Sequence, residues 1–183
     1  MNLLVLTLEG YQDIELVGFL GALNAGGQAI KITYWNPDGQ KLVGGSNQIG
    51  QIKTTSQTLE ASSFDAIFIP GGKACVGLRT NTKALTLIEQ FIKLDKYIFA
   101  ICDAPNALVD AKLMLNKKYV SYPIENIEKV ATSLRQTNVK TWVDGKYITG
   151  DSPMASIELA LLVIKTIFGQ QLAQQTFKKI NGY

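Results

Sequence analysis

The chain has 183 residues, of which 46% are hydrophobic, and a net charge of +3. This apolar content excludes an intrinsically disordered protein, and the length predicts a single domain over residues 1–183 with a sizeable core. The excess of 18 basic over 15 acidic residues is too small to indicate nucleic-acid binding, so we expect no nucleic-acid partner.

Histidine is absent from the chain. Without an imidazole base, the Ser–His–Asp and Cys–His mechanisms of nucleophilic catalysis are excluded. Cys75 and Cys102 are the only cysteines, too few for a four-ligand zinc centre without histidine. We therefore expect neither a metal nor a cofactor.

Three further features bear on location. The two cysteines lack the spacing of a disulfide framework, which indicates a reducing compartment. The first seven residues carry no basic leader and predict a strand rather than a signal peptide. The longest apolar stretch, residues 157–164, contains Glu158 and is too short to cross a bilayer. We expect a cytoplasmic protein with no membrane partner.

Strand-like and helix-like segments alternate along the chain. Runs rich in apolar, β-branched and aromatic residues predict strands at 3–7, 29–35, 65–69, 97–102, 119–122, 139–143 and 146–149. Helical spacing predicts helices at 14–25, 81–94, 106–114 and 153–167, the first with Leu16, Val17, Leu20 and Leu23 on its apolar face. Asp144-Gly145 predicts a tight hairpin, and residues 42–52 a smaller one. This alternation predicts an α/β fold with a mostly parallel sheet covered on both faces.

Residues 97–105 combine a strand, a cysteine and a helix start. The apolar run ends at Cys102, and Pro105 is typical of the first turn of a helix. A thiol at such a corner lies at the positive end of a helix dipole, which favours the nucleophilic thiolate. The alternative is a buried structural cysteine that ends a core strand.

Three segments end predicted strands at the same edge of the sheet: Glu9-Gly10, Gly71-Gly72 and Cys102. Ligands of parallel α/β sheets bind beyond this edge, which favours a functional Cys102 over a structural one. The N–H groups of Gly71-Gly72 and of the following helix start are candidate oxyanion donors. A plain tight turn is the alternative for the two glycines.

Acidic residues at the start of the first predicted helix are further candidates. Asp13 is the expected N-cap. Glu15 has apolar neighbours, and a carboxyl facing inward there would have a raised pKa and donate a hydrogen bond to the Cys102 thiolate. The alternative is an exposed glutamate at a helix start. Cys75 is either a second thiol of the site or a packing residue. Asp103 opposes thiolate formation, because it places a negative charge beside Cys102.

Four landmarks, in this order and spacing, resemble the ThiJ/PfpI superfamily, a class I glutamine amidotransferase-like group that includes protein deglycases. They are Glu15 ahead of Gly26-Gly27, residues 64–72, residues 100–105 and residues 150–158. The resemblance covers nearly the whole chain and implies a flavodoxin-like three-layer sandwich, usually a homodimer. It implies that Cys102 is the elbow cysteine and Glu15 the protonated carboxyl that contacts it. The oxyanion donors would be the N–H groups of Gly72 and Asp103, with Gly71, Tyr122, Cys75 and Asp13 as candidate pocket residues.

The chain departs from the superfamily at two positions. Tyr122 stands where many members have histidine, and a tyrosine with its ordinary pKa near 10 is a poor general base. A peptidase is therefore not expected. Asp103 replaces the usual small residue after the cysteine. Chemistry that needs only a cysteine and a carboxyl remains, namely conversion of reactive carbonyls by a cofactor-free glyoxalase or deglycase. The alternatives are an oxidation-sensing stress protein and a chaperone-like dimer with little turnover.

Overall fold

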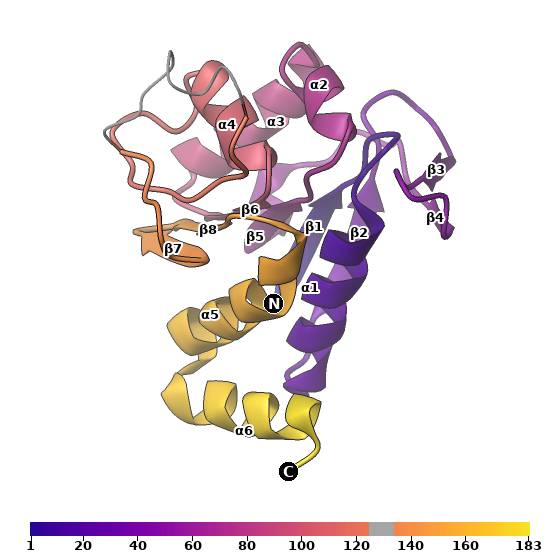
Figure 1. The fold of residues 1–183 in the computed structure, drawn as a ribbon. Helices are drawn as coiled ribbons and strands as arrows, with labels where there is room; N and C mark the ends of the chain where they lie inside the picture. Colours follow the sequence, from indigo (N-terminus) through magenta and orange to yellow (C-terminus); the bar gives the residue numbers. More distant parts are fainter. Residues whose placement is uncertain (125–133) are drawn as a thin grey trace.

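The protein, described here from a computed structural model of residues 1–124 and 134–183, is an α/β sandwich around a six-stranded sheet (Figure 1). The strand order is β2-β1-β5-β6-β8-β7. These strands are β1 (Asn2–Leu6), β2 (Lys31–Trp35), β5 (Ala66–Ile69), β6 (Tyr97–Ile101), β7 (Thr141–Asp144) and β8 (Tyr147–Gly150). Neighbouring strands pair in parallel except β7, which pairs antiparallel with β8 across the predicted Asp144-Gly145 turn. The mostly parallel sheet confirms the predicted fold class.

Helices cover both faces of the sheet. On one side lie α2 (Ala74–Leu78), α3 (Thr82–Lys93) and α4 (Ala104–Asp110), and on the other α1 (Asp13–Ala25), α5 (Ser156–Phe168) and α6 (Gln170–Asn181) (Figure 1). Each face has its own core, because successive residues of a buried strand point to opposite sides. Leu4 and Ile67 belong to the first core, whereas Leu3 and Phe68 belong to the second. Short 3-10 turns at Ala61–Ser63 and Pro153–Ala155 complete the helical elements.

Close packing fixes where α1 lies. Its Phe19 ring stacks on Phe68 of β5 with the ring centroids 4.0 Å apart. At Gly18 the helix approaches the start of α5 so closely that a Cβ would lie 2.9 Å from the Cβ of Ser156. These contacts hold the first turn of α1 against the carboxyl ends of the strands.

A small antiparallel hairpin lies outside the main sheet. It consists of β3 (Leu42–Gly44) and β4 (Gln51–Lys53), as the sequence predicted for residues 42–52. A parallel bridge joins Gly45 to Tyr11, and an antiparallel bridge joins Tyr11 to Gly72. The hairpin is thereby tied to the loop that precedes α1.

Several predicted elements are corrected. Residues 119–122 do not form a strand, because the β7–β8 hairpin occupies that edge of the sheet and Val120 N–H donates to the Thr149 hydroxyl instead. The helix after Cys102 ends at Asp110 rather than at residue 114. Val17 is 70% exposed and does not belong to the inward face of α1. The short α2 and the C-terminal α6 were missed.

None of the described residues belongs to a helix with the length and apolar character that a membrane crossing requires.

Candidate functional site

Cys102 lies directly after β6, at the turn that leads into α4. Its φ of 62° is in the left-handed region, which is unfavourable for a residue with a side chain. Two hydrogen bonds hold this conformation: Cys102 N–H donates to Gly150 O at 2.9 Å, and Tyr122 N–H donates to Cys102 O at 2.8 Å. The strained turn is typical of a nucleophile elbow, in which a side chain is presented at the edge of a parallel sheet.

Glu15 reaches the same edge from the first turn of α1. Gln12 caps this helix, since its side chain accepts a hydrogen bond from Ile14 N–H at 3.4 Å. The Glu15 carboxyl is fully buried, and its Oε2 accepts from Gly71 N–H at 2.6 Å. The Cys102 thiol lies close enough to the same carboxyl for each group to affect the pKa of the other. The buried Oε1 has no hydrogen-bond partner among the described residues. Glu15 therefore points inward, as predicted.

Gly71 and Gly72 make room for this contact. A Cβ at Gly71 would lie 2.6 Å from Cys102 Cβ and 2.8 Å from Glu15 Oε2. Gly72 has φ +92°, and a Cβ there would lie 2.6 Å from both Gly10 O and Gln12 N. The backbone N–H groups of Gly72 and Asp103 lie close enough to the Cys102 sulfur to lower the pKa of its thiol. The structure thus places the two N–H groups that the resemblance implied as oxyanion donors around one sulfur atom.

Burial governs the protonation of the pair. It raises the pKa of Glu15 to about 7, although the hydrogen bonds from Cys102 and Gly71 lower it. Burial and the nearby Glu15 carboxylate also raise the pKa of Cys102, against the lowering effect of the Gly72 and Asp103 N–H groups. The expectation of a thiolate favoured by the helix dipole alone is wrong, because α4 has seven residues and desolvation outweighs its effect. The Cys102 thiol therefore keeps its proton near neutral pH, whereas Glu15, with a pKa of about 7, is partly ionised there and can accept it.

Asp103 is held by a residue that the sequence analysis missed. Arg79, at the end of α2, donates hydrogen bonds to both carboxylate oxygens of Asp103, with Nη1–Oδ2 at 2.8 Å and Nη2–Oδ1 at 2.9 Å. The buried Asn106 donates from Nδ2 to Asp103 Oδ1 at 2.9 Å and to Tyr122 O at 3.1 Å. Arg79 is one of two arginines among the 18 basic residues, and this rarity is the only sequence signal that pointed to it.

Asp13 has a different position from the one predicted. Gln12 is the N-cap, and Asp13 is instead buried, where its Oδ2 accepts from Asn47 N–H at 2.8 Å. A Cβ at Gly45 would lie 2.2 Å from Asp13 Oδ1, so the glycine allows the β3–β4 loop to close over this carboxylate. Asp13 therefore anchors that loop to α1.

Cys75 and Tyr122 are the two remaining candidate pocket residues. Cys75, a residue of α2, is a free thiol with no exposed surface, and burial in the core raises its pKa. This environment supports the packing alternative. Tyr122 is 45% exposed, and its backbone supports both Cys102 and Asn106. The described residues contain no group of three or more cysteine, aspartate or glutamate side chains arranged to hold a metal ion.

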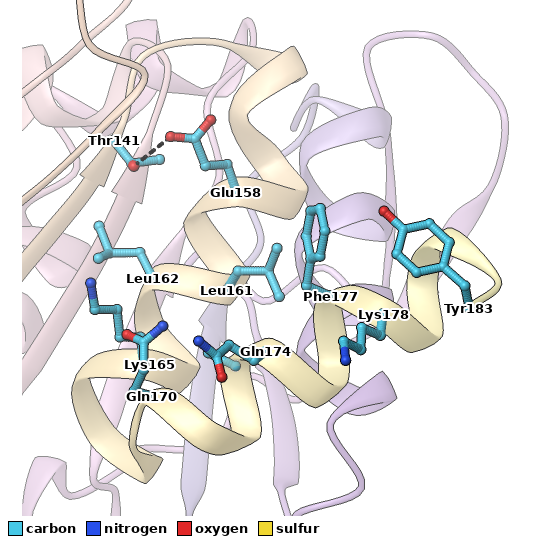
Figure 2. A pocket seen from close by; sticks show the side chains of 11 residues that line it. Thr141, Glu158, Leu161, Leu162, Lys165, Gln170, Gln174, Phe177, Lys178 and Tyr183 are labelled. Carbon is cyan, nitrogen blue, oxygen red and sulfur yellow. Dashed lines mark hydrogen bonds between the residues drawn. The ribbon is translucent and has the colours of Figure 1, made fainter.

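A separate groove of about 610 Å³ lies between α5, α6 and β7 (Figure 2). Leu161, Leu162 and Phe177 provide apolar walls, and Glu158 accepts a hydrogen bond from the Thr141 hydroxyl at 2.9 Å. Glu158 therefore faces this groove and not the elbow. None of the predicted site residues lines it.

Comparison with known proteins shows the family of the chain. Residues 1–166 match the DJ-1/PfpI family. Deglycase PH1704 of Pyrococcus horikoshii is 24% identical over 84% of this chain and 91% of its own length. The uncharacterized protein MG029 of Mycoplasma genitalium is 32% identical over 69% of this chain and 67% of its own. Drosophila melanogaster DJ-1beta superposes with a TM-score of 0.84 at 24% identity, over 98% of this chain and 96% of that one.

Proposed function

Because the chain belongs to the DJ-1/PfpI family, we propose that it is a cysteine-dependent enzyme of the glyoxalase or deglycase type, acting on small reactive carbonyl compounds. The observation that carries the proposal is the single sulfur atom surrounded by a fully buried acid and two backbone donors. Cys102 is the nucleophile, Glu15 the proton carrier, and the N–H groups of Gly72 and Asp103 the oxyanion donors.

The first half of the reaction is an addition. Glu15, with a pKa of about 7, takes the proton of the Cys102 thiol as the sulfur attacks an electron-poor aldehyde carbon. A carbon–sulfur bond forms, and the carbonyl π electrons move to the oxygen, which the Gly72 and Asp103 N–H groups stabilise. Glu15 then returns its proton to that oxygen and leaves a neutral hemithioacetal. No histidine is needed, because the carboxyl performs both transfers.

The second half moves a hydrogen and releases the product. With methylglyoxal, the Glu15 carboxylate removes the proton from the carbon bonded to sulfur, and the electron pair forms a double bond to the neighbouring carbon. The oxygen of that neighbouring carbon takes the hydroxyl proton of the sulfur-bearing carbon, which gives an enediolate. Glu15 then delivers its proton to the neighbouring carbon as the carbonyl re-forms at the carbon bonded to sulfur. The hemithioacetal thereby becomes a lactoyl thioester of Cys102. Water cleaves the carbon–sulfur bond of this ester, which releases lactate and restores the thiol. The overall reaction adds one water to one methylglyoxal and requires no redox partner or cofactor.

The direct test is incubation with methylglyoxal, with D- and L-lactate measured enzymatically. We expect lactate in proportion to the concentration of wild-type protein and none above background with Cys102→Ser, because serine cannot provide the thiol. Cys75→Ser is the matched control and should retain most of the activity, since this buried thiol lies outside the reacting group. Equal lactate from wild type and Cys102→Ser would refute the proposal.

The same pair also supports an oxidation-sensing role with little turnover. Cys102 is 8% exposed, whereas Cys75 has no exposed surface, so an oxidant reaches Cys102 first. A protonated Glu15 would then donate a hydrogen bond to the sulfinate oxygen. An absence of lactate from wild-type protein would favour this alternative, or a chaperone-like dimer, over an enzyme.

We further propose a one-domain cytoplasmic protein that acts as a homodimer. Support for pairing comes from Ile14, Val17 and Ile49, apolar side chains that are 52%, 70% and 74% exposed. They border an apolar groove of about 560 Å³ between α1 and the β3–β4 hairpin. Apolar surface of this kind is typical of an interface. A monomeric mass in sedimentation equilibrium would contradict this part of the proposal.

A further inference from the structure

Asp103 places a negative charge beside the Cys102–Glu15 pair, where it opposes ionisation of both groups. Its carboxylate contributes to raising the pKa of both Glu15 and Cys75. An uncompensated negative charge there would oppose ionisation of Cys102, yet the backbone N–H of the same residue lowers the pKa of that thiol. Asp103 therefore both helps and hinders the pair, through different atoms.

Arg79 is placed to neutralise the negative charge of Asp103. Its guanidinium binds Asp103 through two parallel hydrogen bonds of 2.8 and 2.9 Å, the fork geometry that only arginine provides. The fork is itself fixed, because Nε donates to Asp110 Oδ2 at 2.7 Å and Nη1 donates to Cys75 O at 2.9 Å. These bonds raise the pKa of Arg79 further, so it remains a cation at every physiological pH.

We propose that Arg79 is a positioning residue for the Cys102–Glu15 pair: it cancels the charge of Asp103 and holds its carboxylate towards the end of α2. The backbone N–H of Asp103 then acts on Cys102, while the charge of the Asp103 carboxylate is balanced by Arg79. This inference concerns the site of the proposed function, but it does not depend on carbonyl chemistry. The competing explanation is purely structural, in which Arg79 only fastens α2 to α4.

The charged and titratable groups around the sulfur come from three elements. Glu15 comes from α1, Cys75 and Arg79 from α2 and its end, and Asp103 and Asp110 from the start and end of α4. Removing Arg79 breaks its ion pairs with Asp103 and Asp110 and also removes a cation that lowers the pKa of Cys75. The effect of the substitution can therefore be assigned by neutralising each acid in turn.

The test is the rate of Cys102 alkylation by iodoacetamide as a function of pH, with peptide mass spectrometry to distinguish Cys102 from Cys75. In Arg79→Gln, the exposed charge of Asp103 should raise the pH midpoint by about one unit, which is a roughly tenfold slower reaction on the rising limb. The double variant Arg79→Gln with Asp103→Asn should return the midpoint to within about 0.3 unit of wild type. Asp110→Asn, which removes the other acid bound by Arg79, should leave the midpoint unchanged.

Two results would overturn the inference. One is an unchanged midpoint in Arg79→Gln, and the other is a double variant that remains shifted as far as Arg79→Gln alone. Should Arg79→Gln fail to fold, Arg79→Lys carries the test: a lysine keeps the charge but not the fork, and a rise of about half a unit is expected. An unshifted Arg79→Lys profile would then overturn the inference. Because no carbonyl substrate is used, a protein that makes no lactate is tested equally well.

Discussion

Replacement of Gly71 by alanine should both destabilise the protein and abolish the reactivity of Cys102. The added Cβ would lie 2.6 Å from Cys102 Cβ, 2.8 Å from Glu15 Oε2 and 3.0 Å from Ile101 O. Two of these three neighbours are the proposed reacting groups, and the third is backbone of β6. Separating them breaks the contact between the thiol and the carboxyl, because a buried elbow has no free space into which it can shift.

The expected loss of unfolding free energy is about 1–3 kcal/mol, the usual effect of overpacking a well-packed region. It is measured by urea denaturation, together with the iodoacetamide rate of Cys102. Gly77→Ala is the matched control, since nothing lies within 4 Å of a Cβ at that exposed position in α2. It should be neutral or stabilising by up to about 1 kcal/mol. Equal stability and reactivity in the two variants would show that Gly71 does not set the contact.

Substitution of Glu15 by glutamine should make the protein more stable at pH 8 but not at pH 5. The buried carboxyl has its pKa raised from 4.5 to about 7. Between these values the unfolded chain releases a proton that the folded protein retains, so a rising pH favours unfolding. The folded wild type therefore loses stability across this range, whereas glutamine has no charge to bury and retains the hydrogen bond from Gly71.

A shift from 4.5 to about 7 corresponds to at most about 3 kcal/mol, and coupling to Cys102 reduces it. Urea denaturation of both proteins at pH 5 and pH 8 measures the difference. Glu158→Gln is the control, because that carboxyl is exposed and bonded to the Thr141 hydroxyl. The gap between Glu15→Gln and wild type should widen from pH 5 to pH 8, while the gap for Glu158→Gln stays constant. A constant gap for both would mean that Glu15 is already charged at pH 5.

Much of the sheet was predictable because its strands are buried on both faces. Residues 3–7, 65–69 and 97–102 are continuous apolar runs bounded by turn residues, and such runs have few other uses in a globular protein. Their carboxyl ends had to meet at one edge, so the approach of Cys102 to Gly71-Gly72 followed from topology. Helix α1 was predicted from its periodicity, although Val17 proved to be exposed.

Features set by long-range side-chain contacts could not be read from local patterns. Arg79 and Asp103 are 24 residues apart, and nothing in either segment indicates their pairing. Asp13 is a better N-cap by residue type than Gln12, but its side chain binds the loop at Asn47 and leaves Gln12 to cap the helix. The protonation of Cys102 depends on how completely the fold excludes water, so a helix start beside a cysteine was an insufficient basis for predicting a thiolate.

The central claim is that Glu15 keeps its proton near neutral pH because it is buried against the Cys102 thiol. The most direct test is a carbon-13 NMR titration of the Glu15 carboxyl, assigned by comparison with Glu15→Gln. The account predicts a midpoint of about 7, and a higher one when Cys102→Ala removes the thiol that lowers the pKa of this carboxyl. A midpoint at the ordinary value of 4.5 would contradict it.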